Sequence, residues 1–262
     1  MINLNLKGKN ALVCGSTGGI GKASALALAE LGASVTLIAR NELKLKQTLT
    51  ELSVHNGQIH DHLVADFSVA DSINKSLRDA LIKKPYHILI NNTGGPAPGP
   101  ALDASFSDFR AAFEMHLGSA QLLTQLLTPG MKQEKYGRII NIISTSVKIP
   151  IPGLGVSNTI RGAMASWAKT ISSELGPFGI TVNNVLPSTT MTDRLRAIIN
   201  SRAEKSGKTA AQIEDDMINE IPLRRLSEPA EVASLVAFLA SPAAGYISGT
   251  SIPVDGGKTG SI

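Results

Sequence analysis

The chain has 262 residues, of which 43% are hydrophobic and 18% charged, with a net charge of +4 and one cysteine. An apolar fraction this high with so small a net charge excludes intrinsic disorder and predicts a globular protein. The single cysteine, Cys14, excludes an internal disulfide and a multi-cysteine zinc site, so we expect no metal centre.

Short apolar runs without alternation predict strands that are buried on both faces of a parallel sheet. They span Ala11–Cys14, Val35–Ala39, His62–Ala65, His87–Asn91, Arg138–Ile143, Thr181–Leu186 and Ser251–Val254. Helical patterns between them span Ile20–Leu31, Glu42–Val54, Ala70–Lys83, Phe106–Leu127, Ser157–Leu175 and Pro229–Ala240. This alternation predicts an α/β fold over residues 1–262, a single-domain Rossmann-type doubly wound parallel sheet of about seven strands with helices on both faces.

Two segments interrupt the alternation. Thr93–Ala101 (TGGPAPGPA) predicts a loop because its glycines and prolines suit neither helix nor strand. Residues 188–222 contain polar helical pieces and no strand pattern. Both segments follow strands, and ligands of doubly wound sheets bind beyond the carboxyl ends of the strands. We therefore expect the first segment to line a cleft and residues 188–222 to form a substrate lid.

The turn after the first strand is rich in glycine and leads directly into a helix. It reads Cys14-Gly15-Ser16-Thr17-Gly18-Gly19-Ile20-Gly21. Glycine permits a tight turn and close approach of the backbone to a pyrophosphate, and the amino end of a helix offers unpaired N–H groups to phosphates. The pattern favours a dinucleotide site over a plain turn.

The spacing of these glycines and the motifs that follow resemble the short-chain dehydrogenase/reductase family, most closely in pattern the 3-oxoacyl-(acyl-carrier-protein) reductases. Asn91-Asn92-Thr93-Gly94 is similar to the family's N-N-A-G, and Val254-Asp255-Gly256-Gly257 to its carboxyl-terminal signature. The resemblance and the glycine turn assign cofactor binding to Gly15, Ser16, Thr17, Gly19, Ile20, Gly21, Lys22, Arg40, Asp66, Phe67, Asn92, Gly94, Arg161 and Pro187.

The residue at the end of the second strand bears on cofactor choice. An acidic side chain there would accept a hydrogen bond from a ribose 2′-OH and select NAD(H), whereas an arginine accommodates a 2′-phosphate. This chain has Arg40, and Lys22 adds a second cation just after the last glycine. We predict NADP(H) over NAD(H); the alternative reading of Arg40 is a solvated arginine at a strand end.

The residues that the resemblance implies for catalysis are only partly present. The family uses a serine, a proton-donating tyrosine, a lysine four residues after it and an asparagine. Ser144 matches the serine, but Ser157, Arg161 and His116 stand where the tyrosine, lysine and asparagine are expected. Tyr86, Tyr136 and Tyr246 are followed four positions later by Ile90, Ile140 and Thr250, so none recreates the pair.

These replacements predict an atypical proton delivery. A serine hydroxyl is much less acidic than a phenol, and arginine stays protonated. Arg161 can anchor the cofactor's ribose or a substrate anion, whereas Ser157 either binds ligand or serves as a helix N-cap. His116 and Lys148 are the possible substitute proton donors. The candidate catalytic residues are therefore Ser144, Ser157, Arg161 and His116.

Three functions remain open at this stage. The first is an NADP(H)-dependent oxidoreductase acting on a ketone or alcohol, with a 3-oxoacyl thioester as one candidate substrate. The second is a nucleotide-binding protein without redox turnover, working as a sensor or subunit. The third is a lyase or isomerase that binds an anionic substrate through the polar cluster.

The sequence also indicates the cellular location and the binding partners. The N-terminal sequence lacks the apolar core of a signal peptide, and no stretch approaches the roughly 18 apolar residues of a membrane span. Basic residues come singly or in pairs, which argues against nucleic acid. We expect a cytoplasmic protein with a small-molecule substrate and no membrane partner. The resemblance implies a homodimer or homotetramer; Lys132 and Lys135 would suit an acidic carrier protein, but Phe178 replaces a docking arginine of the family's carrier-protein reductases.

Overall fold

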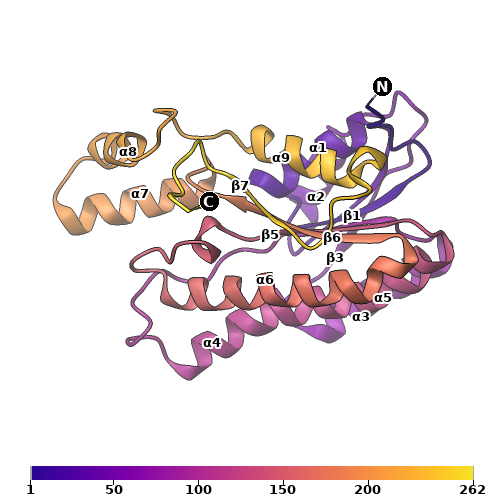
Figure 1. Cartoon of the computed structure of the whole chain (residues 1–262), viewed down its shortest axis with the longest axis horizontal. Coiled ribbons are helices and arrows are strands. Elements are labelled where there is room, and N and C mark those ends of the chain that lie inside the picture. Colours follow the sequence, from indigo (N-terminus) through magenta and orange to yellow (C-terminus); the bar gives the residue numbers. More distant parts are fainter. Residues whose placement is uncertain (1, 262) are drawn as a thin grey trace.

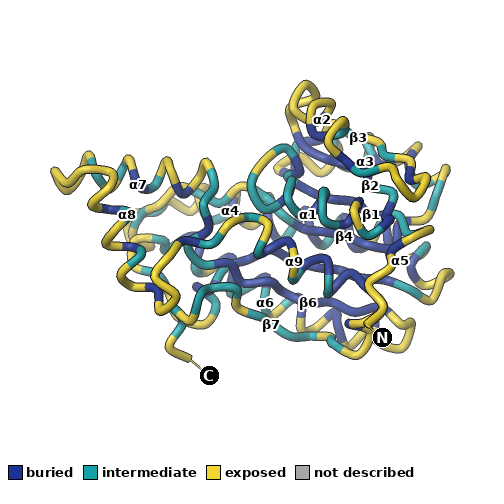
Figure 2. Tube along the Cα trace, turned by 90° about the horizontal axis from the view of Figure 1, so that it is seen from above, coloured by how far each residue is buried: buried dark blue, intermediate teal, exposed yellow. Residues whose placement is uncertain are grey.

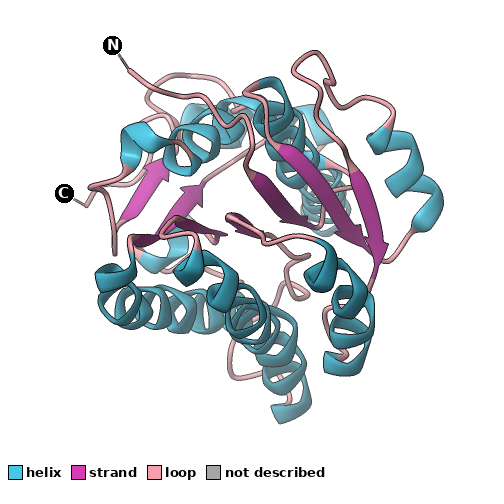
Figure 3. Ribbon diagram, turned by 90° about the vertical axis from the view of Figure 1, so that its right-hand side faces the viewer, coloured by secondary structure: helices cyan, strands magenta, loops and turns pink. Residues whose placement is uncertain are grey.

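The computed structural model describes residues 2–261 and contains a sheet whose neighbouring strands all run parallel. Its strands are β1 Asn10–Cys14, β2 Ser34–Ala39, β3 Asp61–Val64, β4 Ile88–Asn91, β5 Gly137–Ile142, β6 Ile180–Pro187 and β7 Ser251–Val254. Their order in the sheet is β3-β2-β1-β4-β5-β6-β7, and helices cover both faces (Figure 3). The predicted Rossmann-type doubly wound fold is confirmed. From β1 the chain first adds strands toward one edge of the sheet and then, from β4 on, toward the other edge. Doubly wound sheets bind ligands at this switch point between β1 and β4.

The helices follow the predicted pattern with two differences. They are α1 Gly19–Glu30, α2 Glu42–Leu49, α3 Ala70–Lys83, α4 Phe106–Phe113, α5 Ser119–Gln133, α6 Gly155–Leu175, α7 Asp193–Ser206, α8 Ala210–Asn219 and α9 Pro229–Ala240. The expected helix over Phe106–Leu127 is divided into α4 and α5 by a π-helical turn, η1, at Glu114–Gly118. The helix that begins at Glu42 ends at Leu49, five residues earlier than expected, and short turns follow it.

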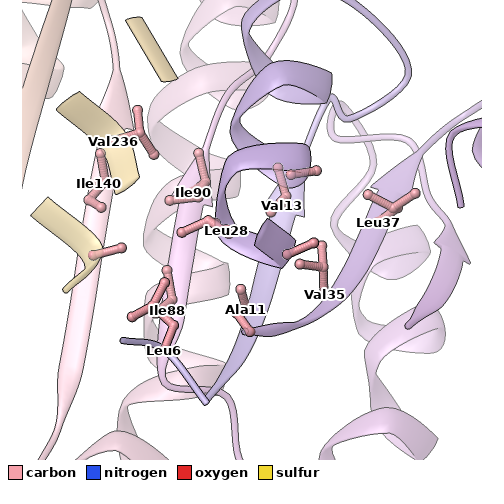
Figure 4. Packing of buried hydrophobic residues seen from close by; sticks show 14 of the residues in the cluster. Leu6, Ala11, Val13, Leu28, Val35, Leu37, Ile88, Ile90, Ile140 and Val236 are labelled. Carbon is pink, nitrogen blue, oxygen red and sulfur yellow. The ribbon is translucent and has the colours of Figure 1, made fainter. Parts of the chain in front are cut away.

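Two hydrophobic cores hold the helices to the sheet, one on each face. On one face, side chains such as Val13 and Ile90 pack against Leu28 of α1 and Val236 of α9 (Figure 4). On the other face, Leu12 and its neighbours pack against α3, α5 and α6. Successive residues of a strand point to opposite faces, so a fully apolar run is needed to serve both cores.

The segment between β6 and α9 extends beyond the end of the sheet. Helices α7 and α8 form an arm at one end of the molecule (Figure 1), and much of its surface is exposed (Figure 2). The arm has a small core of its own, in which Leu195 and Ile199 of α7 pack with Ile213 and Met217 of α8. At its base, a short β-bridge between Thr190 and Ser227 joins the two ends of this segment. Among residues 2–261, no helix is both long and apolar enough to cross a membrane.

Candidate active site

Two glycines of the turn between β1 and α1, Gly15 and Gly21, are packed too closely for a side chain. A Cβ atom on Gly15 would lie 2.5 Å from the carbonyl oxygen of Asn92, and one on Gly21 would lie 2.2 Å from the oxygen of Gly15. Gly15 also has a φ of +59°, which favours glycine. The N-cap of α1 is Gly18, and no side chain forms a capping hydrogen bond at the amino end of the helix. The N–H groups of this end can therefore donate to a phosphate group.

The end of β4 supports the glycine turn from the neighbouring strand. The Asn92 side-chain amide donates to the carbonyl oxygens of Cys14 and Gly15, at 3.3 Å each. Asn91, one residue earlier, donates to Asn141 of β5 at 2.8 Å, and Asn141 in turn donates to Asn184 of β6 at 2.9 Å. This row of amides fixes the Asn91 side chain at the carboxyl edge of the sheet. Ser16 adds a fully buried hydroxyl with no hydrogen-bond partner in the described chain.

The residues assigned to the adenosine end of a cofactor lie after β2 and β3. Arg40 is exposed and forms no ion pair within the described residues, so its guanidinium is available to an anion. The Asp66 carboxylate accepts hydrogen bonds from the backbone and hydroxyl of Ser68, at 2.9 and 2.7 Å, and these lower its pKa. Phe67 is buried in the core, so only its backbone can serve a ligand. Lys22 is held by Glu51 at 2.7 Å, which partly neutralises the second cation.

The remaining cofactor residues surround the same edge of the sheet. Thr17 and Ile20 are partly exposed in and after the glycine turn, and Gly94 has open space where a side chain would begin. Pro187 ends β6 and is buried. The N-terminal part of the arm reaches this turn, because a Cβ on Gly19 would lie 3.1 Å from the methyl group of Thr192.

A small cavity opens at the carboxyl ends of β1, β4 and β5, directly beside the glycine turn. Its lining is Cys14, Asn91, Thr93, His116, Ser119, Leu123, Ile142, Arg161 and Met164. Burial raises the pKa of the Cys14 thiol to about 12, so this group stays protonated and unreactive at neutral pH. His116 and Arg161, two of the four candidate catalytic residues, therefore meet in one cavity next to the expected nucleotide position.

His116 lies on the π-helical turn η1 and is 3% exposed. Its Nδ1 atom is hydrogen-bonded to the Thr93 hydroxyl. Its Nε2 atom is buried and has no partner within residues 2–261. Burial, with smaller contributions from the positive charges of Arg161 and Arg194, lowers the pKa of His116 to about 3. The imidazole is therefore neutral at physiological pH, with one nitrogen left for a ligand.

Arg161 and Ser157 lie one turn apart on α6 and share a helix face. Arg161 is 8% exposed, and its Nη1 donates to the carbonyl oxygen of Ile142 at 2.9 Å. Burial lowers the pKa of its guanidinium to about 10, still well above neutral pH. The alternative reading of Ser157 as a helix N-cap is wrong. The N-cap of α6 is Leu154, because the backbone N–H of Gly155 is held by the carbonyl of Gly99 at 2.9 Å, which starts the helix earlier.

Ser144 and Lys148 flank a short turn after β5. The Ser144 hydroxyl oxygen accepts from the backbone N–H of Ser146 at 3.1 Å, so its own hydrogen is free to be donated. Lys148 is exposed on the loop and does not line the cavity. The three tyrosines also lie elsewhere. Tyr86 and Tyr136 precede β4 and β5 at the opposite edge of the sheet, where they donate to Thr36 at 3.0 Å and to Ala240 at 2.7 Å.

The first turn of α7 closes over the loop after β4. The two terminal nitrogens of Arg194 donate to the carbonyl oxygens of Gly95 and Pro96, at 2.7 and 2.9 Å. A Cβ on Gly95 would lie 2.7 Å from the centre of that guanidinium, so a side chain there would displace Arg194. A larger hollow lies under the other end of the arm, between Ile221, Arg225 and Asp255. It lacks the His116 and Arg161 pair, and the Arg225 guanidinium in it is already paired with Glu231.

Sequence reasoning missed three residues of this site, namely Asn91, Thr93 and Arg194. Thr93 left a signal in the sequence, since it replaces the alanine of the family's N-N-A-G. Asn91 stood in the same motif without an assigned role. Arg194 left no local signal, because its partners lie 99 and 98 residues away along the chain.

Comparison with known proteins agrees with this architecture. A family model described as enoyl-(acyl carrier protein) reductase matches residues 15–259. The chain belongs to the short-chain dehydrogenase/reductase family. The 7α-hydroxysteroid dehydrogenase of Escherichia coli K12 is 32% identical over 97% of this chain and 96% of its own length. As a member of this family, the chain is an NAD(P)-dependent oxidoreductase, as the resemblance implied.

Two solved structures are close to the chain throughout its length. YwfH, an NADPH-dependent reductase involved in bacilysin biosynthesis, has a TM-score of 0.91 and 30% identity, covering 97% of this chain and 99% of its own. The L-sorbose reductase of Gluconobacter frateurii, solved with NADPH and L-sorbose, has a TM-score of 0.93 and 25% identity, covering 99% and 100%. These dehydrogenase/reductase neighbours support a nicotinamide cofactor for the chain.

Proposed function

We propose that the chain is an NADP(H)-dependent reductase of a small ketone, in which His116 takes the part that the family gives to tyrosine. The observation that carries this proposal is the free, buried Nε2 atom of His116 in a cavity that also includes Cys14 of the glycine turn. A carbonyl placed there would lie beside the imidazole and the end of β1 that leads into the glycine turn. When bound, NADPH would supply the hydride.

The residues of the chain would hold and protonate the carbonyl oxygen. Because Nδ1 accepts from the Thr93 hydroxyl in this assignment, the imidazole proton is on Nε2 and is donated to the substrate oxygen. As negative charge develops, Nε2 donates its proton to the substrate oxygen while Nδ1 takes the proton of Thr93. Solvent then supplies one proton to Nε2 and Nδ1 returns its proton to Thr93, which restores the starting tautomer. A neutral histidine is suited to this role because its N–H group can polarise a carbonyl although the ring carries no charge. The nearby charge of Arg161 favours the anionic oxygen, whereas Ser144 does not line this cavity and is given no part in the transfer.

The test is NADPH oxidation with a panel of simple ketones, oxo acids and 3-oxoacyl thioesters. Replacement of His116 by leucine is expected to lower kcat by roughly 10²- to 10⁴-fold, the usual range for loss of a proton donor. Thr93→Val should lower kcat less and leave KM nearly unchanged. Tyr136→Phe is the matched control, since its hydroxyl lies at the other edge of the sheet and should not matter.

The same experiment distinguishes the proposed reductase from the alternative, a nucleotide-binding protein without redox turnover. Tight NADPH binding with no oxidation across the panel would favour that alternative. So would activity that appears only in a Ser157→Tyr, Arg161→Lys double variant, since the wild type would then have lost the reaction. Full activity in His116→Leu would refute the role of the histidine.

The preference for NADP(H) is supported by the exposed, unpaired Arg40 and by the NADPH of the neighbouring structures. Arg40→Asp is expected to shift the ratio of NADPH to NADH affinity by roughly 100-fold toward NADH, because it exchanges a phosphate partner for a ribose partner. Lys44→Asp, the same charge change on exposed α2, is the control. Equal shifts in both variants would show a general electrostatic effect and no 2′-phosphate contact.

We also propose that the chain is a homo-oligomer. Phe106 and Phe113 of α4 are 82% and 47% exposed, and they stand on a helix of the region that family members commonly pack between subunits. Burial of such large apolar side chains favours association. Light scattering of the purified protein would distinguish a dimer or tetramer from a monomer.

A further inference from the structure

The guanidinium of Arg161 is buried beside the cavity without a counter-ion. It forms no ion pair within residues 2–261, and its single hydrogen bond there is to the carbonyl oxygen of Ile142. An arginine has five N–H donors, so most of them are left without a protein acceptor. The cavity lining contains no aspartate or glutamate. A buried charge with so few partners is strongly destabilising unless an anion joins it.

A second buried arginine of this protein shows what a purely structural arginine requires. Arg138 of β5 is 5% exposed, and it donates to the carbonyl oxygens of Gly137, Gly179 and Ser241. Its guanidinium also lies over the Tyr136 ring, 4.1 Å from the ring centre. Arg161 has neither the additional carbonyls nor the aromatic ring. The difference indicates that Arg161 is arranged for a ligand and that Arg138 is arranged for the fold.

Arg194 brings a second positive charge to the same place. Its guanidinium is held on the loop that follows Thr93, the residue that contacts His116. It has no acidic partner within the described residues, and its charge contributes to lowering the pKa values of both Arg161 and His116. Two guanidinium groups that form no ion pair within residues 2–261, and of which one lowers the pKa of the other by repulsion, create a field that attracts an anion.

We propose that the substrate of this site carries a carboxylate, bound by Arg161 with Arg194 at the mouth, while its ketone oxygen faces His116. This inference rests on the proposed reductase function and adds the chemical class of the substrate, an oxo acid. Arginine suits the task because its planar fork binds a carboxylate through two parallel hydrogen bonds. A cofactor ribose would offer Arg161 only neutral hydroxyl groups, which leave the buried charge without compensation.

The proposal is tested with three pairs of substrates that differ only in the charged group. They are pyruvate, acetoacetate and 4-oxopentanoate, each compared with its methyl ester, and they place the carboxylate at increasing distance from the ketone. For the pair of best-fitting length, kcat/KM for the acid should exceed that for the ester by roughly 100-fold, because the ester leaves the arginine unpaired. Equal rates for acid and ester in every pair would overturn the proposal.

Arginine variants then test whether Arg161 and Arg194 cause the preference for the acid over its methyl ester. Arg161→Gln should lower kcat/KM for the acid by roughly 100-fold more than it lowers kcat/KM for the ester, and leave NADPH affinity within about threefold. Arg194→Gln should act in the same direction with a smaller effect. Arg196→Gln is the control, because this exposed arginine of α7 is paired with Asp193. If Arg161→Gln weakens NADPH binding and affects acid and ester alike, Arg161 serves the cofactor and the proposal is wrong.

Calorimetry tests the carboxylate site through binding of the acids, so this test does not depend on turnover. If no substrate is reduced, the proposed function fails for this panel, but the three acids can still be titrated into the protein loaded with NADP⁺. Binding of an acid that its ester does not share and that Arg161→Gln abolishes would support the carboxylate site. Absence of binding by all three acids would overturn it.

Discussion

The candidate active site has two sides that are built in different ways, the glycine turn beside the cavity (the nucleotide wall) and the helical segments that carry His116 and Arg161 (the catalytic wall). The glycine turn is determined by backbone contacts, since Gly15 and Gly21 have no space for a Cβ. The Asn92 side-chain amide also holds the turn by donating to two of its backbone carbonyl oxygens. The opposite wall is determined by side chains, with His116 and Arg161 projecting from helices that the fold would form in any case. Side chains on a helix surface can be exchanged without moving the backbone, whereas a packed turn tolerates no such change. This explains how the nucleotide wall keeps the family pattern while the catalytic wall departs from it.

The largest effect that tests this comparison is expected from Gly21→Ala. The new Cβ would lie 2.2 Å from a backbone oxygen, so the turn would have to open. We expect NADPH affinity to fall at least roughly 100-fold and the free energy of unfolding to fall by about 3 kcal/mol. Calorimetry and urea unfolding measure the two quantities.

Gly18→Ala is the matched control within the same turn. Gly18 has extended backbone, and no atom lies within 4 Å of the position that a Cβ would take, so affinity should change less than about threefold. If both alanine variants bind NADPH like the wild type, the nucleotide wall is not limited by its backbone, and the contrast between the two walls fails.

His116 on the catalytic wall predicts that the free energy of unfolding depends on pH, an effect of intermediate size. The pKa of His116 is about 3 in the folded chain and near 6.5 when unfolded, so only the unfolded chain gains a proton in this range. The neutral imidazole therefore contributes its full stability above pH 6.5 and loses it progressively as the pH falls toward 3. Between pH 7.5 and 5, the wild type should lose about 2 kcal/mol of unfolding free energy relative to His116→Asn.

Urea unfolding of both proteins at pH 7.5, 6.5 and 5 checks this expectation. His87, whose pKa is also lowered, mainly by burial, is present in both proteins, so its contribution cancels in the difference. Parallel loss of stability in wild type and variant would mean that His116 accepts a proton in the folded state. The proton transfer proposed for the neutral imidazole would then need revision.

The same contrast explains what could be predicted from the sequence. The strands were predictable because buried parallel strands require apolar runs, and the helix Ala70–Lys83 was found with its observed ends. The glycine turn was predictable because backbone crowding admits one residue type. The π-helical turn at Glu114–Gly118 was not, since it depends on packing and has no local pattern. The Thr93 to His116 contact joins residues 23 apart, and the start of α6 is set by Gly99, so neither follows from local sequence.

The smallest expected effect concerns Lys22, where the nucleotide wall depends on a side chain. Its Nζ is paired with Glu51 at 2.7 Å, and both side chains are partly exposed, at 31% and 46%. Such a pair contributes at most about 1 kcal/mol to folding. Glu51→Gln would free the cation for a 2′-phosphate, so NADPH affinity should rise by about threefold at low salt, while NADH affinity stays unchanged and the gain disappears at high salt.

Asp216→Asn separates this local effect from a change in net charge. It releases Lys208 from an exposed ion pair of 2.6 Å on the arm, with the same change of charge as Glu51→Gln. When both variants are compared at 0.1 M salt, exposed charges more than about 10 Å apart are largely screened, so the variant on the arm should leave NADPH affinity unaltered. If both variants raise it equally, the gain comes from overall charge, and Lys22 has no part in the site. If only Glu51→Gln does, a side chain contributes to cofactor choice even on the wall that the backbone determines.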